Sequence, residues 1–243
     1  MSSIKRICLW SGPRNISTAL MYSFAQRNDC KVFDEPLYAH YLSRTPARVY
    51  HPGAEEVIAT MENDGEKVVH DLILGDFDKP VIFFKHMTHH LHNIDLGFLD
   101  QTVNVLLTRD PFDMLPSYAV NVEKPTLQDV GYKQHVELLH DLQSRGQNPP
   151  VLDSKQILLN PRKVLNELCE RIGIPFQEAM LSWEAGARLE DGSWAKYWYK
   201  SVHESIGFGK YMQKSEPFPE SLKPLLAECK PYYEKLSELA IQA

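Results

Sequence analysis

Residues 4–35 read IKRICLWSGPRNISTALMYSFAQRNDCKVFDE, and this stretch decides the fold class. The apolar run at 4–10 predicts a strand that ends in a Ser-Gly-Pro turn. Apolar residues at helical spacing then predict a helix that begins near Ser17, with Ser17 or Thr18 as its N-cap. A second strand follows at 30–33. A strand, a loop, a helix and another strand in this order build a parallel sheet.

The rest of the chain extends the same pattern. Runs rich in β-branched and apolar residues at 80–85 and 103–109 predict strands that are buried on both faces, and 151–153 is a fifth, weaker candidate. We expect helices at 54–63, 112–121, 129–144, 162–172 and 221–241, and we expect Pro116, Pro224 and Pro231 to kink or shorten two of them. The sequence therefore predicts one doubly wound α/β domain over residues 1–243, with a mostly parallel central sheet of about five strands.

Composition narrows the function classes. The 243 residues carry a formal net charge of −6, which disfavours a general nucleic-acid binder because such proteins need a basic surface. No apolar run approaches the roughly 18 residues of a membrane span, and the N-terminal apolar run is too short for a signal peptide. The four cysteines are scattered, so we interpret them as reduced thiols and expect a cytoplasmic protein.

Polar groups follow each of the first four strands of the predicted sheet. Ligands of open parallel sheets bind beyond the carboxyl ends of the strands. The chemistry should therefore lie in four places, which are 11–18, Asp34-Glu35, Lys85-His86 and Arg109-Asp110.

The first of these places has the features of an anion-binding loop. A loop that turns from a buried strand into a helix presents unpaired backbone N–H groups and the positive end of the helix dipole. Gly12 allows a close approach of the backbone, Arg14 adds a forked cation, and Ser17 and Thr18 add hydroxyl groups. The G-x-x-x-x-G-K-[ST] pattern of a Walker A loop is missing. We expect the loop to bind the phosphate or sulfate end of a nucleotide.

At this point the sequence resembles a family. SGPRNISTAL at 11–20 is similar to the 5′-phosphosulfate loop of sulfotransferases, often written Pro-Arg-Ser-Gly-Thr-Thr-Leu in bacterial and Golgi-type members. The loop departs from that pattern at Ile16, where a glycine is usual. A strand that ends in Arg109, with Ser117 eight positions later, resembles the family's 3′-phosphate element. Glu35, 21 residues after Arg14, resembles the catalytic glutamate of the tyrosylprotein-sulfotransferase branch, and 151–176 looks like the family's late strand and helix.

The resemblance implies a P-loop-NTPase-like, sulfotransferase-type fold and 3′-phosphoadenosine 5′-phosphosulfate (PAPS) as co-substrate. The sulfuryl group would pass to a hydroxyl or amine of a small acceptor that the sequence does not specify. In this interpretation Arg14, Glu35 and Lys85 are catalytic: Arg14 stabilises the transferring group, Glu35 is the base, and Lys85 approaches the leaving oxygen. Residues predicted to bind the nucleotide are Arg14, Asn15, Ser17, Thr18, Arg109 and Ser117.

Several alternatives remain open at this level. His86 rivals Glu35 as the base, whereas the histidines at 86–92 lack the HExxH arrangement, so we predict no metal site. The aromatic segment 194–201 is compatible with stacking on adenine, with an acceptor pocket, or with core packing. The competing functions are a nucleotide-dependent kinase and a degenerate nucleotide-binding or regulatory protein, the second favoured by Ile16.

Overall fold

The computed structural model describes residues 4–212 and 216–243, and its centre is a five-stranded sheet. The strands are β1 (Lys5–Ser11), β2 (Cys30–Asp34), β3 (Val81–Met87), β4 (Val103–Thr108) and β5 (Val151–Asp153), in the spatial order β2-β3-β1-β4-β5. All four strand pairings are parallel. The predicted α/β fold is confirmed, and the sheet is entirely parallel rather than mostly parallel.

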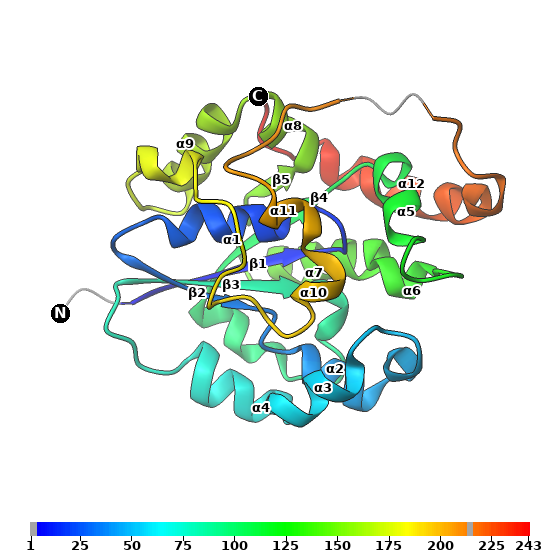
Figure 1. Cartoon of the computed structure of the whole chain (residues 1–243). Helices are drawn as coiled ribbons and strands as arrows, with labels where there is room; N and C mark the ends of the chain where they lie inside the picture. Colours follow the sequence, from blue (N-terminus) through cyan, green and yellow to red (C-terminus); the bar gives the residue numbers. More distant parts are fainter. Residues whose placement is uncertain (1–3, 213–215) are drawn as a thin grey trace.

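Alternate residues of the central strand supply two separate cores. Ile7 and Leu9 point into one cluster with Leu20 and Phe24 of helix α1 (Ser17–Ala25), whereas Trp10 points into a second cluster on the other face of the sheet. Helices α1, α8 and α9 cover the first face, and α4 and α7 cover the second (Figure 1). Because both faces are covered, the strands contain continuous apolar runs, and this is why the sequence pattern predicted them closely.

The helices begin and end near the predicted positions, with one break that the sequence pattern missed and one shortening that it predicted. The segment predicted at 129–144 is divided at Gly131, which has a left-handed φ of 72°. The terminal helix is shortened to Lys223–Ser237, with Pro224 in its first turn and Pro231 inside it. The remaining elements are α2 (Tyr38–Arg44), η1 (Pro46–Val49), α3 (Ala54–Thr60), α4 (Gly65–Val68), η2 (Val69–Ile73), η3 (Thr88–His90), η4 (Leu96–Gln101), α5 (Pro111–Tyr118), α6 (Leu127–Val130), α7 (Tyr132–Ser144), α8 (Ser154–Leu159), α9 (Pro161–Arg171), η5 (Glu178–Leu181), α10 (Ala195–Trp198), α11 (Lys200–His203), η6 (Glu220–Leu222) and α12 (Lys223–Ser237).

The cap predicted for α1 is wrong. The N-cap is Ile16, which has a left-handed backbone (φ 59°, ψ 17°) and makes no side-chain capping bond. Ser17 and Thr18 are the first two residues of the helix. Their N–H groups lie in the first turn, where an α-helix offers no internal acceptor, and so remain available to a ligand.

The register of the sheet brings the polar strand ends to one level. Lys85 of β3 lies opposite Leu9 of β1 on one side and opposite Asp34 of β2 on the other. Helices α10 and α11 cross in front of these strand ends (Figure 1).

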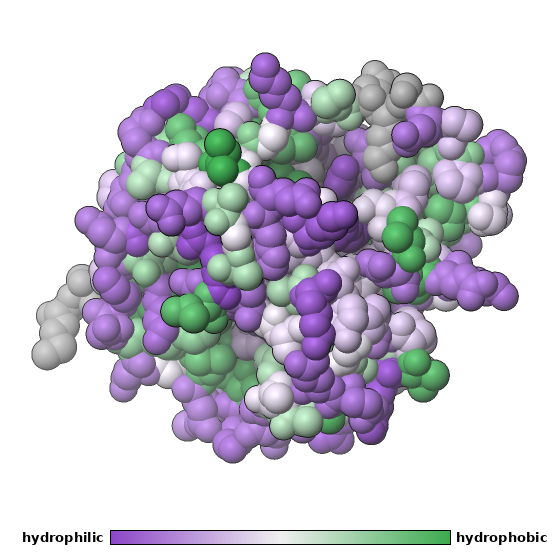
Figure 2. Space-filling view, viewed as in Figure 1, coloured by the Kyte–Doolittle hydropathy of each residue, from purple (hydrophilic) through white to green (hydrophobic). Residues whose placement is uncertain are grey.

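The face of the molecule seen in Figure 2 is mostly hydrophilic, with apolar residues scattered over it. None of the helices in the described ranges combines the length and apolar character needed to cross a bilayer.

Candidate active site

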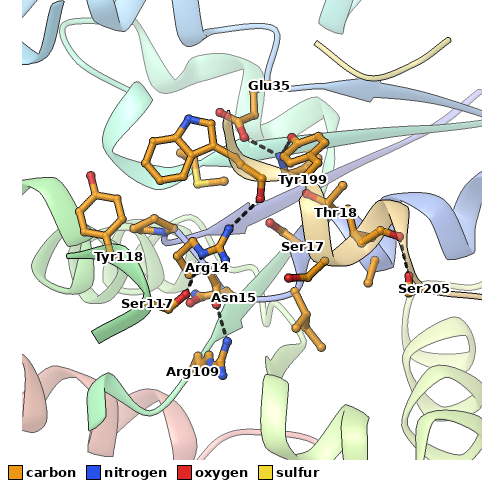
Figure 3. A pocket seen from close by; sticks show the side chains of 18 of the residues that line it. Arg14, Asn15, Ser17, Thr18, Glu35, Arg109, Ser117, Tyr118, Tyr199 and Ser205 are labelled. Atoms are coloured by element: carbon orange, nitrogen blue, oxygen red, sulfur yellow. Dashed lines mark hydrogen bonds and ion pairs between the residues drawn. The ribbon is translucent and has the colours of Figure 1, made fainter. Parts of the chain in front are cut away.

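A cavity of about 490 Å³ opens at the carboxyl ends of the strands. The whole loop from Pro13 to Ala19 lines it, together with Glu35, Lys85, Arg109 and Ser117. Figure 3 shows Arg14, Glu35, Arg109 and Ser117 around the cavity; they come from the loop after β1, from the residues that follow β2 and β4, and from α5. Lys85 comes from β3. The structure therefore brings all the sequence-predicted site residues to one cavity, although they are up to about a hundred positions apart in the chain.

Two arginines of the cavity have no acidic partner. Arg14 donates from Nε to the Ser117 hydroxyl (3.0 Å) and from Nη1 to the carbonyl of Trp198 (2.8 Å), and Arg109 donates from Nη1 to the carbonyl of Arg14 (2.8 Å). Neither guanidinium forms an ion pair with any carboxylate of the described chain. Burial and the nearby Arg109 charge lower the pKa of Arg14. Two partly buried cations without a counter-charge require an anion, because uncompensated charge is unfavourable away from water.

The backbone of the loop is held in an unusual conformation. Arg14 (φ 56°) and Ile16 (φ 59°) are both left-handed, a region that a β-branched residue rarely adopts. Asn15 between them is buried and donates from Nδ2 to the carbonyl of Leu107, so its side chain anchors the loop to β4. The Asn15 side chain thus has a structural role, and a contact with the nucleotide would come from its backbone. Successive N–H groups in this conformation form a concave anion site next to the first turn of α1.

Lys85 is fully buried at the centre of a polar cluster. Its ammonium donates to Asp34 Oδ1 (2.8 Å), Glu35 Oε1 (2.5 Å) and the Tyr199 hydroxyl (2.6 Å). Tyr199 in turn donates to Asp34 Oδ2 (2.8 Å) and accepts from Trp194 Nε1 (3.0 Å). Burial alone would lower the pKa of Lys85, but the charges of Asp34 and Glu35 outweigh it and hold that pKa well above its usual value. Lys85 is therefore a fixed cation with all three ammonium hydrogens engaged.

Glu35 differs from Asp34 because one of its oxygens is unengaged. Oε1 accepts from Lys85, and Oε2 has no hydrogen-bond partner in the described part of the chain, while the residue lines the cavity. Burial raises the pKa of Glu35 to about 7, with Lys85 opposing that rise and Asp34 adding to it. Its backbone is left-handed (φ 43°) and its N–H donates to the carbonyl of Lys85 (2.8 Å). A carboxylate with this pKa suits proton abstraction near neutral pH.

His86, the rival base, lies elsewhere. Side chains alternate along β3, so His86 points to the opposite face of the sheet from Lys85 and stacks on Trp10 (ring centroids 4.3 Å apart). It is completely buried, it is not among the residues that line the cavity, and burial lowers its pKa to about 3. His86 thus belongs to the core.

Several residues of this cavity had no single role assigned from the sequence. Tyr199 completes the Lys85 cluster and Trp198 binds Arg14 through its carbonyl, and both lie in the aromatic segment 194–201. His51, His89 and His90 also line the cavity. No group of three or more His, Cys, Asp or Glu side chains in residues 4–212 and 216–243 is arranged to hold a metal ion.

A five-stranded parallel α/β sheet, with the loop Pro13–Ala19 lining a cavity at the carboxyl ends of its strands, defines the class of protein. The sequence profile of the sulfotransferase domain matches residues 5–240, and the chain belongs to this family. Among solved structures, a sulfotransferase from Alicyclobacillus acidocaldarius is 14% identical with a TM-score of 0.59, over 99% of this chain and 97% of that one. The sulfotransferase domain from the curacin biosynthetic pathway has a TM-score of 0.55 at 14% identity, over 95% and 99% of the two chains.

Two Arabidopsis thaliana proteins are much more similar in sequence. Branched-chain-amino-acid aminotransferase-like protein 2 is 39% identical and branched-chain-amino-acid aminotransferase-like protein 1 is 41% identical, each over 225 residues. These matches cover 92% of this chain but 40% of each relative. The chain therefore spans less than half the length of the curated relatives it matches.

Proposed function

We propose that the chain transfers a sulfuryl group from PAPS to a hydroxyl or amine of a small acceptor. One observation carries this proposal: a single cavity joins an anion loop with two unpaired arginines to a buried carboxylate whose pKa is about 7. The arginines and the loop match an anionic donor, and Glu35 matches an acceptor that must lose a proton. A protein that only binds nucleotide would need the first half of this site but not the second.

In the proposed reaction the acceptor oxygen or nitrogen attacks sulfur, and the bond between sulfur and the bridging oxygen of the donor breaks. The acceptor proton passes to Oε2 of Glu35, and 3′-phosphoadenosine 5′-phosphate leaves with the electron pair. By analogy with phosphoryl transfer, positioning and electrostatic stabilisation dominate catalysis of such a step. Arg14 and the N–H groups of the loop stabilise the transferring group, and Arg109 with Ser117 holds the 3′-phosphate.

Lys85 acts through its link to Glu35. In the free enzyme its three hydrogens are engaged, so contact with the leaving oxygen requires the release of one partner. Glu35 is that partner, because a carboxyl group that has just gained the acceptor proton attracts the ammonium less strongly. Proton uptake by Glu35 thus frees Lys85 at the moment when negative charge develops on the leaving oxygen.

The departure at Ile16 is compatible with this function. The residue adopts the left-handed backbone that glycine would adopt more easily, so the loop keeps its concave shape despite the bulkier side chain.

A kinase function has no support in the loop, which lacks the Lys-[ST] pair. Aminotransferase chemistry has none either, because Lys85 is held between two carboxylates. The four free cysteines suit a reducing compartment, and we propose that the protein is cytoplasmic.

Isothermal titration with 3′-phosphoadenosine 5′-phosphate tests the donor site. We expect binding that weakens at least tenfold in Arg109→Ala, and little discrimination by that variant between this nucleotide and 5′-AMP, which lacks the 3′-phosphate. Arg145→Ala, which removes an arginine that is paired with Asp141 and Asp100 outside the cavity, is the matched control. Preference for ATP with Mg²⁺, or equal binding by wild type and Arg109→Ala, would overturn the proposal.

A further inference from the structure

Asp34 is the neighbour of Glu35 in the chain, but it lies behind the cavity. It is not among the described residues that line the cavity, and its side chain is 1% exposed, against 8% for the side chain of Glu35. Both carboxylates accept from Lys85. Because Asp34 is shielded from the cavity, any influence that it has on the reaction acts through its neighbours.

The carboxylate of Asp34 joins the sheet to a segment that is distant in the chain. Its Oδ1 accepts from the Lys85 ammonium at the end of β3 (2.8 Å). Its Oδ2 accepts from the Tyr199 hydroxyl (2.8 Å) and from the Gly192 N–H (3.1 Å). Bonds to an ionised acceptor are stronger than bonds between neutral groups. Asp34 therefore holds segment 192–199 at both of its ends.

Segment 192–199 is packed tightly around these bonds. A Cβ atom on Gly192 would lie 2.1 Å from the ring of Trp194, so the segment has room only for glycine at this position. Trp194 is buried and donates from Nε1 to the Tyr199 hydroxyl (3.0 Å). The position of Tyr199 is thus fixed from two sides, by Trp194 and by Asp34.

The same segment orients Arg14. Tyr199 is both the C-cap of α10 and the N-cap of α11, so the Trp198 carbonyl lies at the end of α10. Carbonyls at a helix end lack a partner within the helix, and this one accepts from Arg14 Nη1 (2.8 Å). Ser117 accepts from Arg14 Nε (3.0 Å), and Nη2 donates to no group of the described chain. Two of the three guanidinium nitrogens are therefore held by the protein, and the third remains for the donor.

Asp34 also acts on Glu35 through its charge. The titratable groups that interact with Glu35 are Asp34 of β2, Lys85 of β3, Tyr38 of α2, and Tyr199. Burial raises the pKa of Glu35 most, Lys85 opposes the rise, and Asp34 adds to it. Without the negative charge of Asp34, the ammonium of Lys85 would act on Glu35 alone, and Glu35 would hold a proton less tightly.

We propose that Asp34 is a positioning residue for both halves of the site. Through segment 192–199 it orients Arg14 towards the donor, and through Lys85 it keeps Glu35 able to take the proton of the acceptor. In Figure 3, Glu35 and Tyr199 lie together on one side of Arg14, and Arg109 lies on the other. The inference rests on the proposed function, since it assigns a further residue to the same site.

Asp34→Asn tests the base half. Asparagine keeps the size of the side chain, but its NH₂ group must face either the Lys85 ammonium or the Gly192 N–H, so one of these donors loses its acceptor. The midpoint of the Glu35 titration should fall by about one pH unit, because a like charge is removed. Carbon-13 NMR of protein labelled at the glutamate carboxyl groups measures this midpoint, and the Glu35 signal is the one that Glu35→Gln lacks. An unchanged or higher midpoint overturns the base half.

Two nucleotides test the donor half by titration. Arg14 acts on the 5′ end of the donor, so a looser segment 192–199 should weaken binding of 3′-phosphoadenosine 5′-phosphate but not of adenosine 3′-phosphate, which lacks the 5′ group. The preference for the first nucleotide should fall about fivefold in Asp34→Asn and in Tyr199→Phe. Tyr199→Phe should leave the Glu35 midpoint in place, because it removes no charge. An equal loss for both nucleotides indicates general destabilisation and overturns the donor half.

Asp153→Asn is the matched control. Asp153 is also buried, and it accepts from a tyrosine hydroxyl (Tyr233, 2.9 Å) and from a backbone N–H (Lys155, 2.7 Å), but it does not line the cavity. This variant should leave the Glu35 midpoint and the nucleotide preference unchanged. If it alters them as Asp34→Asn does, the effects are not specific to Asp34 and the inference is wrong.

The two proposals fail in different ways. If the wild-type chain binds neither nucleotide, the proposed function is wrong and the donor half of the inference falls with it. If the wild type prefers 3′-phosphoadenosine 5′-phosphate and both variants keep that preference, only the inference about Asp34 is wrong. If Asp34→Asn does not fold, Tyr199→Phe decides the donor half.

Discussion

Replacing Glu35 by glutamine removes the proposed base and little else. Glutamine has the same length, and its amide oxygen can still accept from Lys85. The network through Asp34 and Tyr199 does not depend on Glu35. The variant should therefore fold and bind 3′-phosphoadenosine 5′-phosphate with wild-type affinity. The expected loss is in kcat.

General-base catalysis contributes about 10²- to 10⁴-fold, so Glu35→Gln should raise the activation free energy by about 3–5 kcal/mol. The pKa of about 7 also fixes the pH dependence, because the base must be deprotonated to act. About half of the enzyme has an ionised Glu35 at pH 7 and about a tenth at pH 6. The rate should consequently fall about fivefold from pH 7 to pH 6 and rise less than twofold from pH 7 to pH 8.

The assay follows the release of 3′-phosphoadenosine 5′-phosphate from PAPS by chromatography, with a small hydroxyl or amine compound as acceptor, whichever the wild type sulfates fastest. Glu35→Asp is the matched variant: it keeps a carboxylate that is one methylene shorter, and should retain intermediate activity and the acidic fall in rate. Glu35 is not the base if Glu35→Gln retains more than half of the wild-type kcat, or if the rate of that variant shows the same fall between pH 7 and pH 6.

Three further predictions concern stability. Tyr199→Phe removes the hydroxyl shared by Asp34, Lys85 and Trp194, and should lower the free energy of unfolding in urea by about 1–3 kcal/mol; an unchanged midpoint would contradict the network. Gly12→Ala places a methyl group 2.9 Å from the carbonyl oxygen of Val130, so this variant should lower the free energy of unfolding by about 1–3 kcal/mol and weaken nucleotide binding. Gly97→Ala is the control and should change neither, because its methyl group would meet nothing closer than 3.5 Å. Buried neutral histidines make the protein less stable as the pH falls below 6.5, their pKa in the unfolded chain, because only the unfolded chain then takes up their protons; these residues are His51, His86, His89 and His135. Each should lower the free energy of unfolding by about 1 kcal/mol between pH 7 and pH 5.5, and the raised pKa of Glu35 should offset part of this loss. A urea midpoint that rises as the pH is lowered over this range would contradict the prediction.

Local chemistry explains which elements the sequence predicted well. Strands β1, β3, β4 and β5 are buried on both faces over most of their length, whereas the edge strand β2 exposes Lys31. Apolar runs such as PVIFFK mark all five strands to within two residues at each end. Short helices were harder, because a two-turn helix such as Tyr38–Arg44 shows too little periodicity, and the tertiary packing of Tyr38 and Tyr41 defines it. The cap of α1 was misplaced because the loop holds Ile16 left-handed, against its own preference.

The sequence by itself determined the order of strands and helices, the anion loop at 11–18 and the polar residues at the strand ends, since each depends on neighbours in the chain. It also placed Arg14, Glu35, Lys85, Arg109 and Ser117 at one edge of a sheet, because the carboxyl ends of parallel strands share an edge. Only the tertiary structure showed that Glu35 lines the cavity and that His86 does not, because adjacent side chains of β3 face opposite sides of the sheet and the surrounding helices determine which side holds the cavity. The contact of Lys85 with Tyr199 and the place of His51 in the cavity were likewise beyond the sequence: these residues come from distant segments of the chain, and only folding sets the distances between them.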